Sequence, residues 1–545
     1  MKKIAGLLLW LFAFHFGFGQ NVPPNPVLSF SIEEPPLSKT VSPVPFAETI
    51  KAEDLKAHLA ILASDAMEGR ETGTEGQRKA AAYLAQQFEK MGLPRIGEND
   101  SYLQKIAFTQ ENWESIELHV NNKPFKYLWQ FYAFPPTNRD RALLKAKEVI
   151  FLGYGIDDER YSDYKGVNVR GKVVMVYDGE PVNEGGVSQV TGTEVLSDWT
   201  TKYRKKMKAA RAHGASTLLI IIDNDIQKSI RSNRANLLNP KMQIGKGEHP
   251  EKNYANNCFI STKIAKTIAG KKYKKILGAK EKMQSTGKAK SIRLKAKIEL
   301  VQKKRIRQIL GSNVLGFIEG TDEKLKNEVV LVTAHYDHLG KRGKTIFNGA
   351  DDNGSGTSSV LEVAQAFVEA KQKGIGPGRS VLCMLVSGEE KGLLGSQFYA
   401  EFPVFPLENT VADLNMDMVG RTDSKHIDNP FYVYVIGSDR LSTELHQINE
   451  TANATYTQLD LDYTYNADND PNRFYYRSDH YNFAKKGIPS IFYFSGTHKD
   501  YHRPTDTVEK INFEKMEQIA RLVFYTAWEL ANRDKRIEAD VIGRN

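Results

Sequence analysis

Cysteine is almost absent from this chain. Only Cys258 and Cys383 occur in 545 residues, and they lie far apart in the sequence. A disulfide framework is therefore excluded, and the hydrophobic core must hold the fold without cross-links. Apolar residues make up 41% of the sequence, which is enough for such a core, and the length favours two domains over one.

Long apolar runs are also missing after the first residues. No later stretch reaches the roughly 20 apolar residues that a membrane helix needs, so we expect no membrane span. The chain begins with two lysines, an apolar run to Phe18 and small residues before Gln20. This order is typical of a secretory signal, predicted here for residues 1–19. We expect an exported protein, periplasmic or secreted after removal of the signal, with a Pro-rich and Ser-rich extended leader over residues 20–48.

Acidic residues are sparse in one long segment. Residues 201–310 contain 29 Lys or Arg against 6 Asp or Glu, whereas the rest of the chain is net acidic by 14. Few aromatic residues are interleaved with these bases, which argues against nucleic acid as a partner. A solvated basic face is the ordinary interpretation, and attraction to an anionic surface or an acidic substrate is the functional alternative.

Strand-like and helical patterns alternate along most of the chain. Short runs rich in β-branched residues recur, for example at 329–333, 381–386 and 488–494, and amphipathic helical patterns separate them. This alternation predicts an α/β fold. A strand–helix–strand unit at 146–295 interrupts the pattern. It predicts an inserted domain between two segments of a main domain, with a short tail at the end: 49–145, 296–535 and 536–545.

Histidine and carboxylate side chains follow one β-branched run at its end. His335 and Asp337 come directly after this run, and a Gly-rich turn with Asp351 and Asp352 follows before a helical pattern. Ligands bind at strand ends in open α/β sheets. The stretch therefore predicts half of a metal site, in which either aspartate is eligible and His338 is a further candidate ligand.

Three other strand-like runs end in residues of the same kind. Glu389 and Glu390 are adjacent, and they would repel each other unless a dication bound one while the other took a proton from water. Asp417 lies in an apolar run, where an unpaired charge is costly. His502 follows the last run, next to Tyr501. A single histidine of this kind is usually structural, but four such strand ends together predict a site for two Zn²⁺ ions with open positions.

In this order, the segments resemble the co-catalytic di-zinc aminopeptidase superfamily, which also contains glutamate carboxypeptidases and transferrin receptors. The resemblance covers residues 50–535 and includes the Gly-rich turn at 69–76 and the Arg477-Ser478-Asp479-His480 segment. It implies an α/β fold with a twisted mixed β-sheet flanked by helices, in which the main domain is catalytic. The insert resembles a β-rich protease-associated domain through segments 166–176 and 209–222.

The resemblance also implies a role for each site residue. Asp352 begins an Asp-x-x-Ser-Gly run and would bridge two Zn²⁺ ions, so that Asp351 would not be a ligand. His335 and Asp417 would complete one metal site, and Glu390 and His502 would complete the other.

Three further residues would act in catalysis. Glu389 would be the general base, and Tyr501 would donate a hydrogen bond to the developing oxyanion. Asp337 would orient His335, because ligating histidines usually need such a partner. Together these roles imply hydrolysis of a peptide or amide bond by an exported zinc exopeptidase.

Aminopeptidase activity is the expected specificity. The substrate's free amine then needs an acidic or carbonyl-lined pocket, for which Asp468, Asp470 and Asp479 are candidates. A carboxypeptidase acting on acidic peptides, helped by the basic insert, is the alternative.

Two hypotheses come from other functional classes. A metal-free, receptor-like binding module that kept the fold would lack ligands, whereas all five ligands and the base are present. A polyanion-binding insert that carries a passenger hydrolase would bind with steep salt dependence. The sequence leaves the oligomeric state open.

Overall fold

The computed structural model describes residues 41–238, 241–245 and 253–541. The predicted signal at 1–19 and the predicted leader up to residue 40 lie outside these residues. The last part of the predicted leader is helical rather than extended, because α1 (Val44–Ala47) buries Phe46 and Ala47. The Phe46 ring stacks on Trp528 at a centroid distance of 5.6 Å, so this short helix is anchored to the core.

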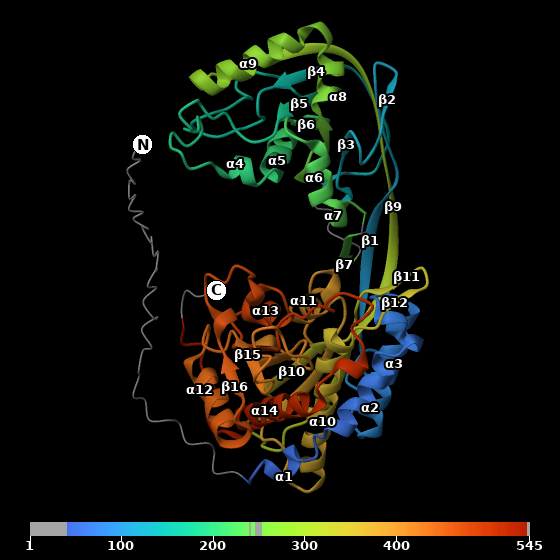
Figure 1. Ribbon diagram of the computed structural model, residues 1–545, viewed down its shortest axis with the longest axis vertical. Coiled ribbons are helices and arrows are strands. Elements are labelled where there is room, and N and C mark those ends of the chain that lie inside the picture. Colours follow the sequence, from blue (N-terminus) through green and yellow to red (C-terminus); the bar gives the residue numbers. More distant parts are fainter. Residues whose placement is uncertain (1–40, 239–240, 246–252, 542–545) are drawn as a thin grey trace, which may run out of the picture. The chain divides into compact units, whose positions relative to one another are not determined.

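One mixed sheet runs through the described part of the chain (Figure 1). Its main path, from edge to edge, is β16 (Asp460–Asp462), β15 (Tyr432–Ile436), β17 (Ser490–Phe494), β14 (Thr410–Met416), β10 (Val329–His335), β13 (Ser380–Val386), β9 (Ser291–Ile318), β4 (Arg141–Leu152), β5 (Val173–Tyr177), β6 (Thr217–Ile222), β8 (Asn256–Ser261) and β3 (Phe131–Tyr132). Off this path, β1 (Leu103–Val120) pairs with β9, β2 (Lys123–Phe125) and β7 (Lys241–Ile244). A separate two-stranded sheet consists of β11 (Gly340–Arg342) and β12 (Thr345–Phe347). The predicted α/β fold with a mixed sheet flanked by helices is confirmed.

The centre of the main domain is parallel. β10 pairs in parallel with β13 and β14, and β14 pairs in parallel with β17. Both faces of β10 are buried: Val330 and Val332 belong to one hydrophobic cluster, and Val329 and Leu331 belong to another. A strand covered on both sides needs apolar residues at successive positions, which explains the uninterrupted β-branched run.

Helices cover both faces of this centre (Figure 1). One face packs on α2 (Ala52–Leu62), α3 (Glu75–Lys90), α10 (Gly356–Gln372) and α14 (Phe513–Asn532). The other face packs on α11 (Leu394–Glu401) and α13 (His480–Ala484). A further helix, α12 (Thr443–Ala452), packs against α14. These helices pack against both faces of the central strands and keep them fixed. The loops that follow the strands therefore start from fixed positions.

The insert is a second α/β layer structure. β4, β5, β6 and β8 are parallel neighbours. One face of these strands packs on α8 (Thr262–Ala269) and α9 (Tyr273–Thr286), and the other packs on α5 (Arg204–Ala212), α6 (Ile226–Ser232) and α7 (Arg234–Leu238). A short helix, α4 (Asp198–Thr201), precedes α5. The identity of the insert as a protease-associated domain stays a prediction.

The insert is continuous with the main domain through a long two-stranded ribbon. β1 and β9 form one antiparallel ladder from the pair Leu103–Val314 to the pair Val120–Ile298. At the insert end of the ladder, Leu118 and Val120 belong to the same hydrophobic cluster as β5 and α8. The insert limits of 146–295 stay a prediction. Strand residues before position 146, such as Leu118 and Val120, contribute to the core of the insert.

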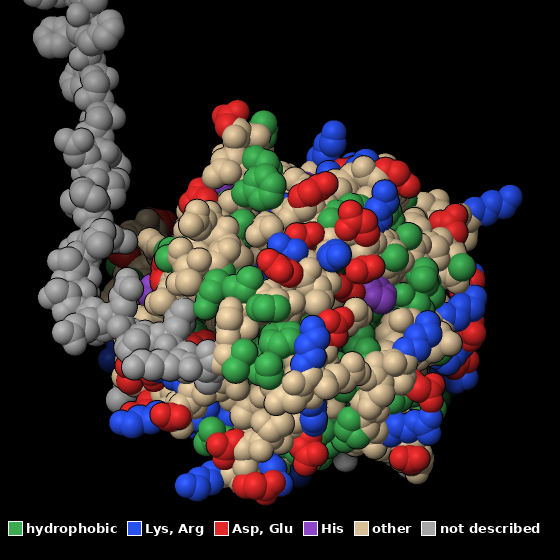
Figure 2. Space-filling view, turned by 90° about the horizontal axis from the view of Figure 1, so that it is seen from below, with side chains coloured by type: hydrophobic (Ala, Val, Ile, Leu, Met, Phe, Trp, Pro, Cys, Tyr) green, Lys and Arg blue, Asp and Glu red, His purple; other side chains and the backbone are tan. Residues whose placement is uncertain are grey.

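Charge is distributed differently in the two parts. Figure 2 shows one face of the molecule on which acidic and basic side chains are interspersed. The insert instead has a run of exposed lysines along α8 and α9. No helix within residues 41–238, 241–245 and 253–541 is long and apolar enough to cross a membrane.

Candidate metal centre

Four strand ends meet at one edge of the main sheet. His335 is the last residue of β10, and Asp417 directly follows β14. A single-turn helix after β13, Glu389–Lys391, carries the adjacent glutamates. His502 lies in the loop after β17. Because these strands are parallel, their carboxyl ends lie side by side, as the sequence predicted.

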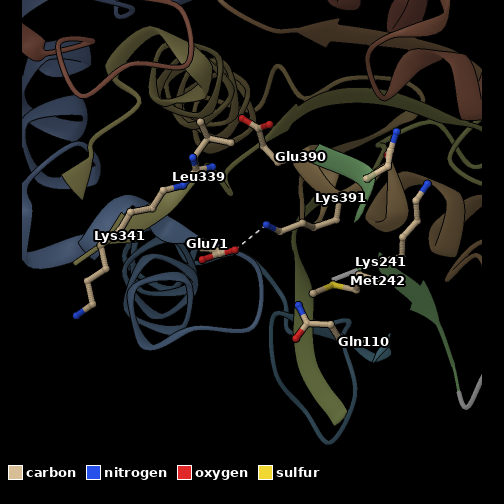
Figure 3. A pocket seen from close by; sticks show the side chains of 10 residues that line it. Glu71, Gln110, Lys241, Met242, Leu339, Lys341, Glu390 and Lys391 are labelled. Atoms are coloured by element: carbon tan, nitrogen blue, oxygen red, sulfur yellow. Dashed lines mark hydrogen bonds and ion pairs between the residues drawn. The ribbon is translucent and has the colours of Figure 1, made fainter. Parts of the chain in front are cut away.

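Two cavities border this edge. A small one of about 40 Å³ is lined by acids of the site together with Met418 and three phenylalanines, Phe474, Phe492 and Phe494. A larger one of about 440 Å³ has Glu390 in its wall and is lined mainly by polar and charged side chains (Figure 3). The site therefore has a small pocket lined by acids and aromatic rings on one side and a larger charged chamber on the other.

The turn that carries Asp352 is tightly packed. Gly349 has a φ of +58°, and a Cβ there would lie 2.3 Å from the Asp352 carbonyl oxygen and 2.5 Å from the His338 ring. Asp506 Oδ2 accepts the backbone N–H groups of Asp351 at 3.0 Å and Asp352 at 3.2 Å. Only glycine fits the start of this turn, and the Asp506 carboxylate holds its backbone.

Arg70 connects the two loops that carry the first ligands. It is buried, and its guanidinium donates to the carbonyl oxygens of Tyr336 at 2.8 Å, Asn348 at 2.7 Å and Gly349 at 2.8 Å. Burial lowers the pKa of Arg70 to about 10, against the opposing pull of Asp352, so it stays charged at neutral pH. The sequence marked this segment only as a Gly-rich turn. The signal that could have revealed its role is an arginine inside such a turn.

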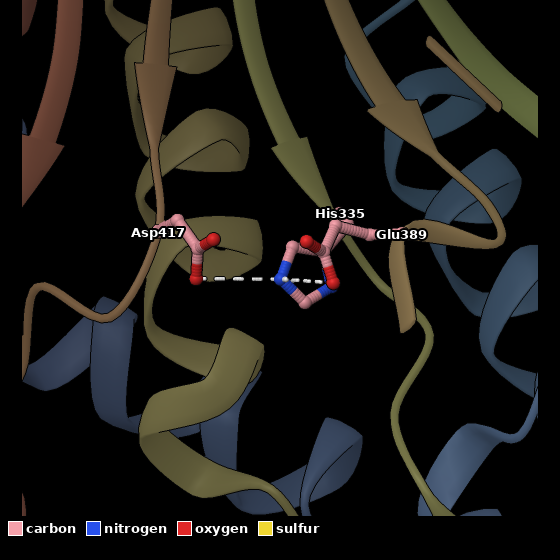
Figure 4. Close-up of side chains that lie close together, drawn as sticks. All are labelled: His335, Glu389 and Asp417. Atoms are coloured by element: carbon pink, nitrogen blue, oxygen red, sulfur yellow. Dashed lines mark ion pairs between the residues drawn. The ribbon is translucent and has the colours of Figure 1, made fainter. Parts of the chain in front are cut away.

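The first ligand group surrounds His335. Its Nε2 lies 3.3 Å from Asp417 Oδ1, 3.5 Å from Asp352 Oδ1 and 3.9 Å from Glu389 Oε2. Figure 4 shows Asp417 and Glu389 reaching toward the same imidazole from two different strands. These atoms could all contact one small cation.

The second group lies on the other side of Asp352. His502 Nε2 is 3.0 Å from Asp352 Oδ2 and 3.3 Å from Glu390 Oε1. His338 Nδ1 is 2.9 Å from the same Glu390 oxygen and 3.7 Å from Asp352 Oδ2. Asp352 thus contributes one oxygen to each group, which is the geometry of a bridging carboxylate. Asp351 points elsewhere: its Oδ1 accepts the N–H of Gly420 at 2.7 Å.

Several of these buried atoms have no hydrogen-bond partner within the described residues. They include His335 Nε2, Asp417 Oδ1 and Glu390 Oε1. Buried polar atoms are normally satisfied, so such a group needs an explanation. Imidazole and carboxylate donors of this kind fit zinc, and a pair of cations would satisfy all of these atoms.

The charge balance supports the same conclusion. Burial alone would favour neutral His335, yet the carboxylates of Asp417 and Glu389 raise its pKa well above the usual value. The carboxylates of Asp352 and Glu390 likewise raise the pKa of His502 to about 10, against the effect of burial. The surplus of carboxylates therefore attracts positive charge, and a bound dication would take the place of these protons.

Glu389 and Glu390 have opposite electrostatic environments. Burial, together with the nearby Glu390 and Asp417, raises the pKa of Glu389 well above its usual range, against the pull of His335. Burial acts in the same direction on Glu390, but the neighbouring imidazoles of His338 and His502 lower its pKa below the usual value. One glutamate is thus suited to hold a proton and the other to remain an anion.

Asp337 contacts His335 through its backbone carbonyl rather than through its carboxylate. The Nδ1 atom of His335 lies 3.1 Å from the Asp337 backbone oxygen and 3.9 Å from its carboxylate. The carboxylate instead accepts the N–H groups of Gly388 at 2.8 Å and Glu389 at 3.1 Å, and the hydroxyl of Thr72 at 2.7 Å. The backbone carbonyl therefore orients His335, and the carboxylate fixes the turn that carries Glu389.

Tyr501 and Arg477 both line the small cavity. The sequence predicted a role for Tyr501 but none for Arg477. The Tyr501 ring stacks on His502 at 3.9 Å, and its hydroxyl is 3.4 Å from Arg477 Nη2. Both side chains can donate hydrogen bonds to an oxygen bound in that cavity. Arg477 belongs to the Arg-Ser-Asp-His segment, which was the available sequence signal.

The three aspartates considered for amine binding do not line this cavity. Asp470 caps its own turn and accepts the N–H of Phe474 at 2.9 Å. Asp479 is buried and accepts the hydroxyl of Ser396. Asp468 lies 3.2 Å from Arg440. The acids of the small cavity are those of the metal centre itself: Asp352, Glu389 and Asp417.

Residues 313–527 match the sequence pattern of peptidase family M28. A probable leucine aminopeptidase of Trichophyton verrucosum (strain HKI 0517) is 32% identical over 242 residues, which are 43% of this chain and 61% of that protein. Aminopeptidase YwaD of Bacillus subtilis (strain 168) is 29% identical over 216 residues, or 38% of this chain and 42% of that protein. The chain thus matches 42% to 61% of the length of these two relatives.

One solved structure extends the likeness beyond that segment. The aminopeptidase from Aneurinibacillus sp. strain AM-1 aligns with a TM-score of 0.52 over 92% of this chain and 99% of its own, at 18% sequence identity. This similarity shows a common fold, which includes the inserted part.

Proposed function

Because residues 313–527 match peptidase family M28, we propose that this chain is an exported zinc exopeptidase, most specifically an aminopeptidase. The observation that carries the proposal is the meeting of five ligand-type side chains and the acid Glu389 at one sheet edge. Its five proposed metal ligands are His335, Asp352, Glu390, Asp417 and His502.

Two Zn²⁺ ions would be held in the two groups that Asp352 bridges. When bound, they would supply a water of lowered pKa and a Lewis acid for the scissile carbonyl. His338 Nδ1 lies close to Glu390 and would hold that ligand in place.

Glu389 is the proposed general base. Its raised pKa suits a group that takes a proton from the attacking water and returns it to the leaving amine. Tyr501 and Arg477 would donate hydrogen bonds to the oxygen of the tetrahedral intermediate. Asp337 keeps the Glu389 backbone fixed, which limits the reorganisation needed before proton transfer.

The small cavity favours an aminopeptidase. Its acids, Glu389 and Asp417, would attract the α-ammonium group of a substrate. Its phenylalanines, Phe474, Phe492 and Phe494, would receive an apolar side chain.

A carboxypeptidase is the second candidate, because one observation favours it. Arg477 also lines the small cavity, and a guanidinium can bind a terminal carboxylate. Peptides with free and acetylated amino termini separate the two candidates: an aminopeptidase loses activity on the acetylated peptide, and a carboxypeptidase does not.

The principal test is Glu389→Gln. The variant should retain two zinc ions per chain, because Glu389 is not a proposed ligand, and kcat for leucine release should fall by about 10³-fold. Metal content and leucine release are measured on the same dialysed sample. Glu401→Gln, at the end of α11, is the matched control and should behave like the wild type. Near wild-type turnover by Glu389→Gln would refute the assignment.

Export and surface attachment complete the proposal. Mature protein that begins at Gln20 would support cleavage after residue 19, and retention of Met1 would contradict it. Ten lysines lie in residues 263–290 beside one acid, Glu281, and among the described residues only Lys280 has an acidic partner, Asp223. We propose that this face contacts an anionic surface. Co-sedimentation with anionic vesicles that disappears at high salt would support it, and equal binding to neutral vesicles would contradict it.

A further inference from the structure

Four cationic side chains line the larger cavity, and the proposed mechanism uses none of them. Lys391 directly follows Glu390, Lys341 and Arg342 belong to β11, and Lys241 belongs to β7. Figure 3 shows labelled lysines from three separate elements around the chamber, together with Glu390 and the ion pair between Lys391 and Glu71. The chamber thus lies directly beside the metal centre.

Two of these cations have no acidic partner among the described residues. Lys391 Nζ lies 2.7 Å from Glu71, and Lys341 Nζ lies 2.7 Å from Glu68. Arg342 instead stacks over the ring of Phe347 at 5.2 Å, and Lys241 has no ion pair with any residue that the structure describes. Since Glu390 faces His338 and His502, its charge is already engaged. The chamber therefore has an excess of positive charge that a ligand could neutralise.

The wall from the insert is firmly attached to the main domain. β7 pairs with β1 from Phe108 to Glu111. Met242 packs in one hydrophobic cluster with Phe108 and Leu394, so Lys241 is held at a defined position. The insert thereby contributes a charged residue to a chamber at the metal centre.

The distribution of charge orients a peptide across the site. The small cavity on the Asp417 side is acidic and attracts an ammonium group, whereas the larger chamber on the Glu390 side repels it. We propose that the chamber binds a carboxylate on the C-terminal side of the scissile bond. The preferred substrates are then short or acidic peptides with an apolar first residue. This inference rests on the proposed aminopeptidase activity.

The carboxylate can come from an acidic second side chain or from a nearby chain terminus, and four leucyl peptides separate these sources. Leu-Glu-Gly-amide is compared with Leu-Gln-Gly-amide, and Leu-Gly-Gly is compared with Leu-Gly-Gly-amide. In each pair that the chamber recognises, the wild-type kcat/KM should be about fivefold higher for the peptide with the carboxylate. Higher ionic strength should bring this ratio of kcat/KM values closer to one, because salt screens the attraction between the carboxylate and the chamber's cations.

The variant Lys241→Glu/Arg342→Glu should bring these ratios to one or below. The ratio is the readout, because a general loss of activity affects both members of a pair equally. If the double variant does not fold, the single variants Lys241→Ala and Arg342→Ala replace it. Each should lower the kcat/KM ratio within a peptide pair. Lys274→Glu on α9 is the matched control for a charge reversal in the insert and should keep the wild-type ratio.

Two different failures are distinguishable. Equal kcat/KM values within both wild-type pairs, or ratios that survive the charge reversal, would overturn the chamber assignment while leucine release still supports the proposed function. Absence of leucine release from every peptide would instead overturn the proposed function. In that case calorimetric binding of the same peptides decides the inference, and equal Kd values within the pairs overturn it.

Discussion

Charged side chains are buried in both the insert and the main domain, but two such clusters differ in how completely they are hydrogen-bonded. In the insert, Lys206 on α5 is buried and donates to three carbonyl oxygens, those of Tyr154, Tyr177 and Gly179. Asp163 is also buried, and it accepts from the backbone of Tyr154 at 3.0 Å and the hydroxyl of Tyr161 at 2.9 Å. The charges of this cluster are matched by the chain itself.

At the sheet edge of the main domain the matching is incomplete. His335 Nε2, Asp417 Oδ1 and Glu390 Oε1 are buried without a hydrogen-bond partner in the part of the chain that the structure describes. A fold tolerates buried charge when its partners are internal. Burial alone therefore does not identify a site, whereas several unsatisfied imidazole and carboxylate atoms gathered at one sheet edge support one.

Replacing Asp352 should have the largest effect. Asp352→Asn removes the negative charge shared by the two ligand groups, so we expect loss of bound zinc and a decrease in kcat/KM of at least about 10³-fold. Metal content after dialysis and leucine release measure the two effects. Asp163→Asn removes an equally buried acid from the insert and should leave the zinc content unchanged. Full zinc content in Asp352→Asn would contradict the bridging role.

Replacing Lys206 tests the other cluster. Lys206→Met leaves three buried carbonyl oxygens without their donor and should lower the free energy of unfolding of the insert by about 3 kcal/mol. Denaturant unfolding of the full chain, followed through the transition of the insert, measures this change. Lys208→Met on the exposed side of the same helix should shift it little. If the two variants unfold alike, the buried amine is not stabilising.

Acid titration gives the smallest predicted effect. Burial raises the pKa of Asp163 from 3.8 to about 6, against the hydrogen bonds it accepts. Between these values the folded state holds a proton that the unfolded chain has released. The free energy of unfolding contributed by this group is therefore highest below pH 4 and falls as pH rises to about 6, by about 2 kcal/mol.

The difference in free energy of unfolding between the wild type and Asp163→Asn isolates the pH-dependent contribution of Asp163. Unfolding of the insert is measured at several pH values from 4 to 7, and the variant should lack the decrease. Parallel pH profiles for the two proteins would show that Asp163 does not titrate as expected.

Much of the fold and the site was accessible from sequence, because the decisive signals are local. A β-branched run followed by His335, or by adjacent glutamates, marks both a buried strand and its end. Parallel pairing then brings such ends together. The ligand candidates could be chosen before any coordinate was known, since each depends only on neighbours a few positions away.

Other features depend on contacts between distant segments and could not be predicted in this way. Arg70 reaches carbonyl oxygens more than 260 positions away in the chain. The proximity of His338 to Glu390 depends on how two loops turn back, and that of Arg477 to Tyr501 depends on a loop after β17. Sequence spacing also cannot tell which group of Asp337 contacts His335, because the carbonyl and the carboxylate of Asp337 point to different partners.

The β1–β9 ribbon has a consequence for the folding kinetics. The pair Val120–Ile298 closes a loop of about 180 residues, and the entropy of closing a flexible chain grows with its length. If the insert collapses first, it brings the two ends of that loop together, and the ladder can then extend residue by residue toward Leu103 and Val314. The insert would thus act as an internal template for the main domain during folding, and damage to its core would slow the assembly of a site formed by distant residues.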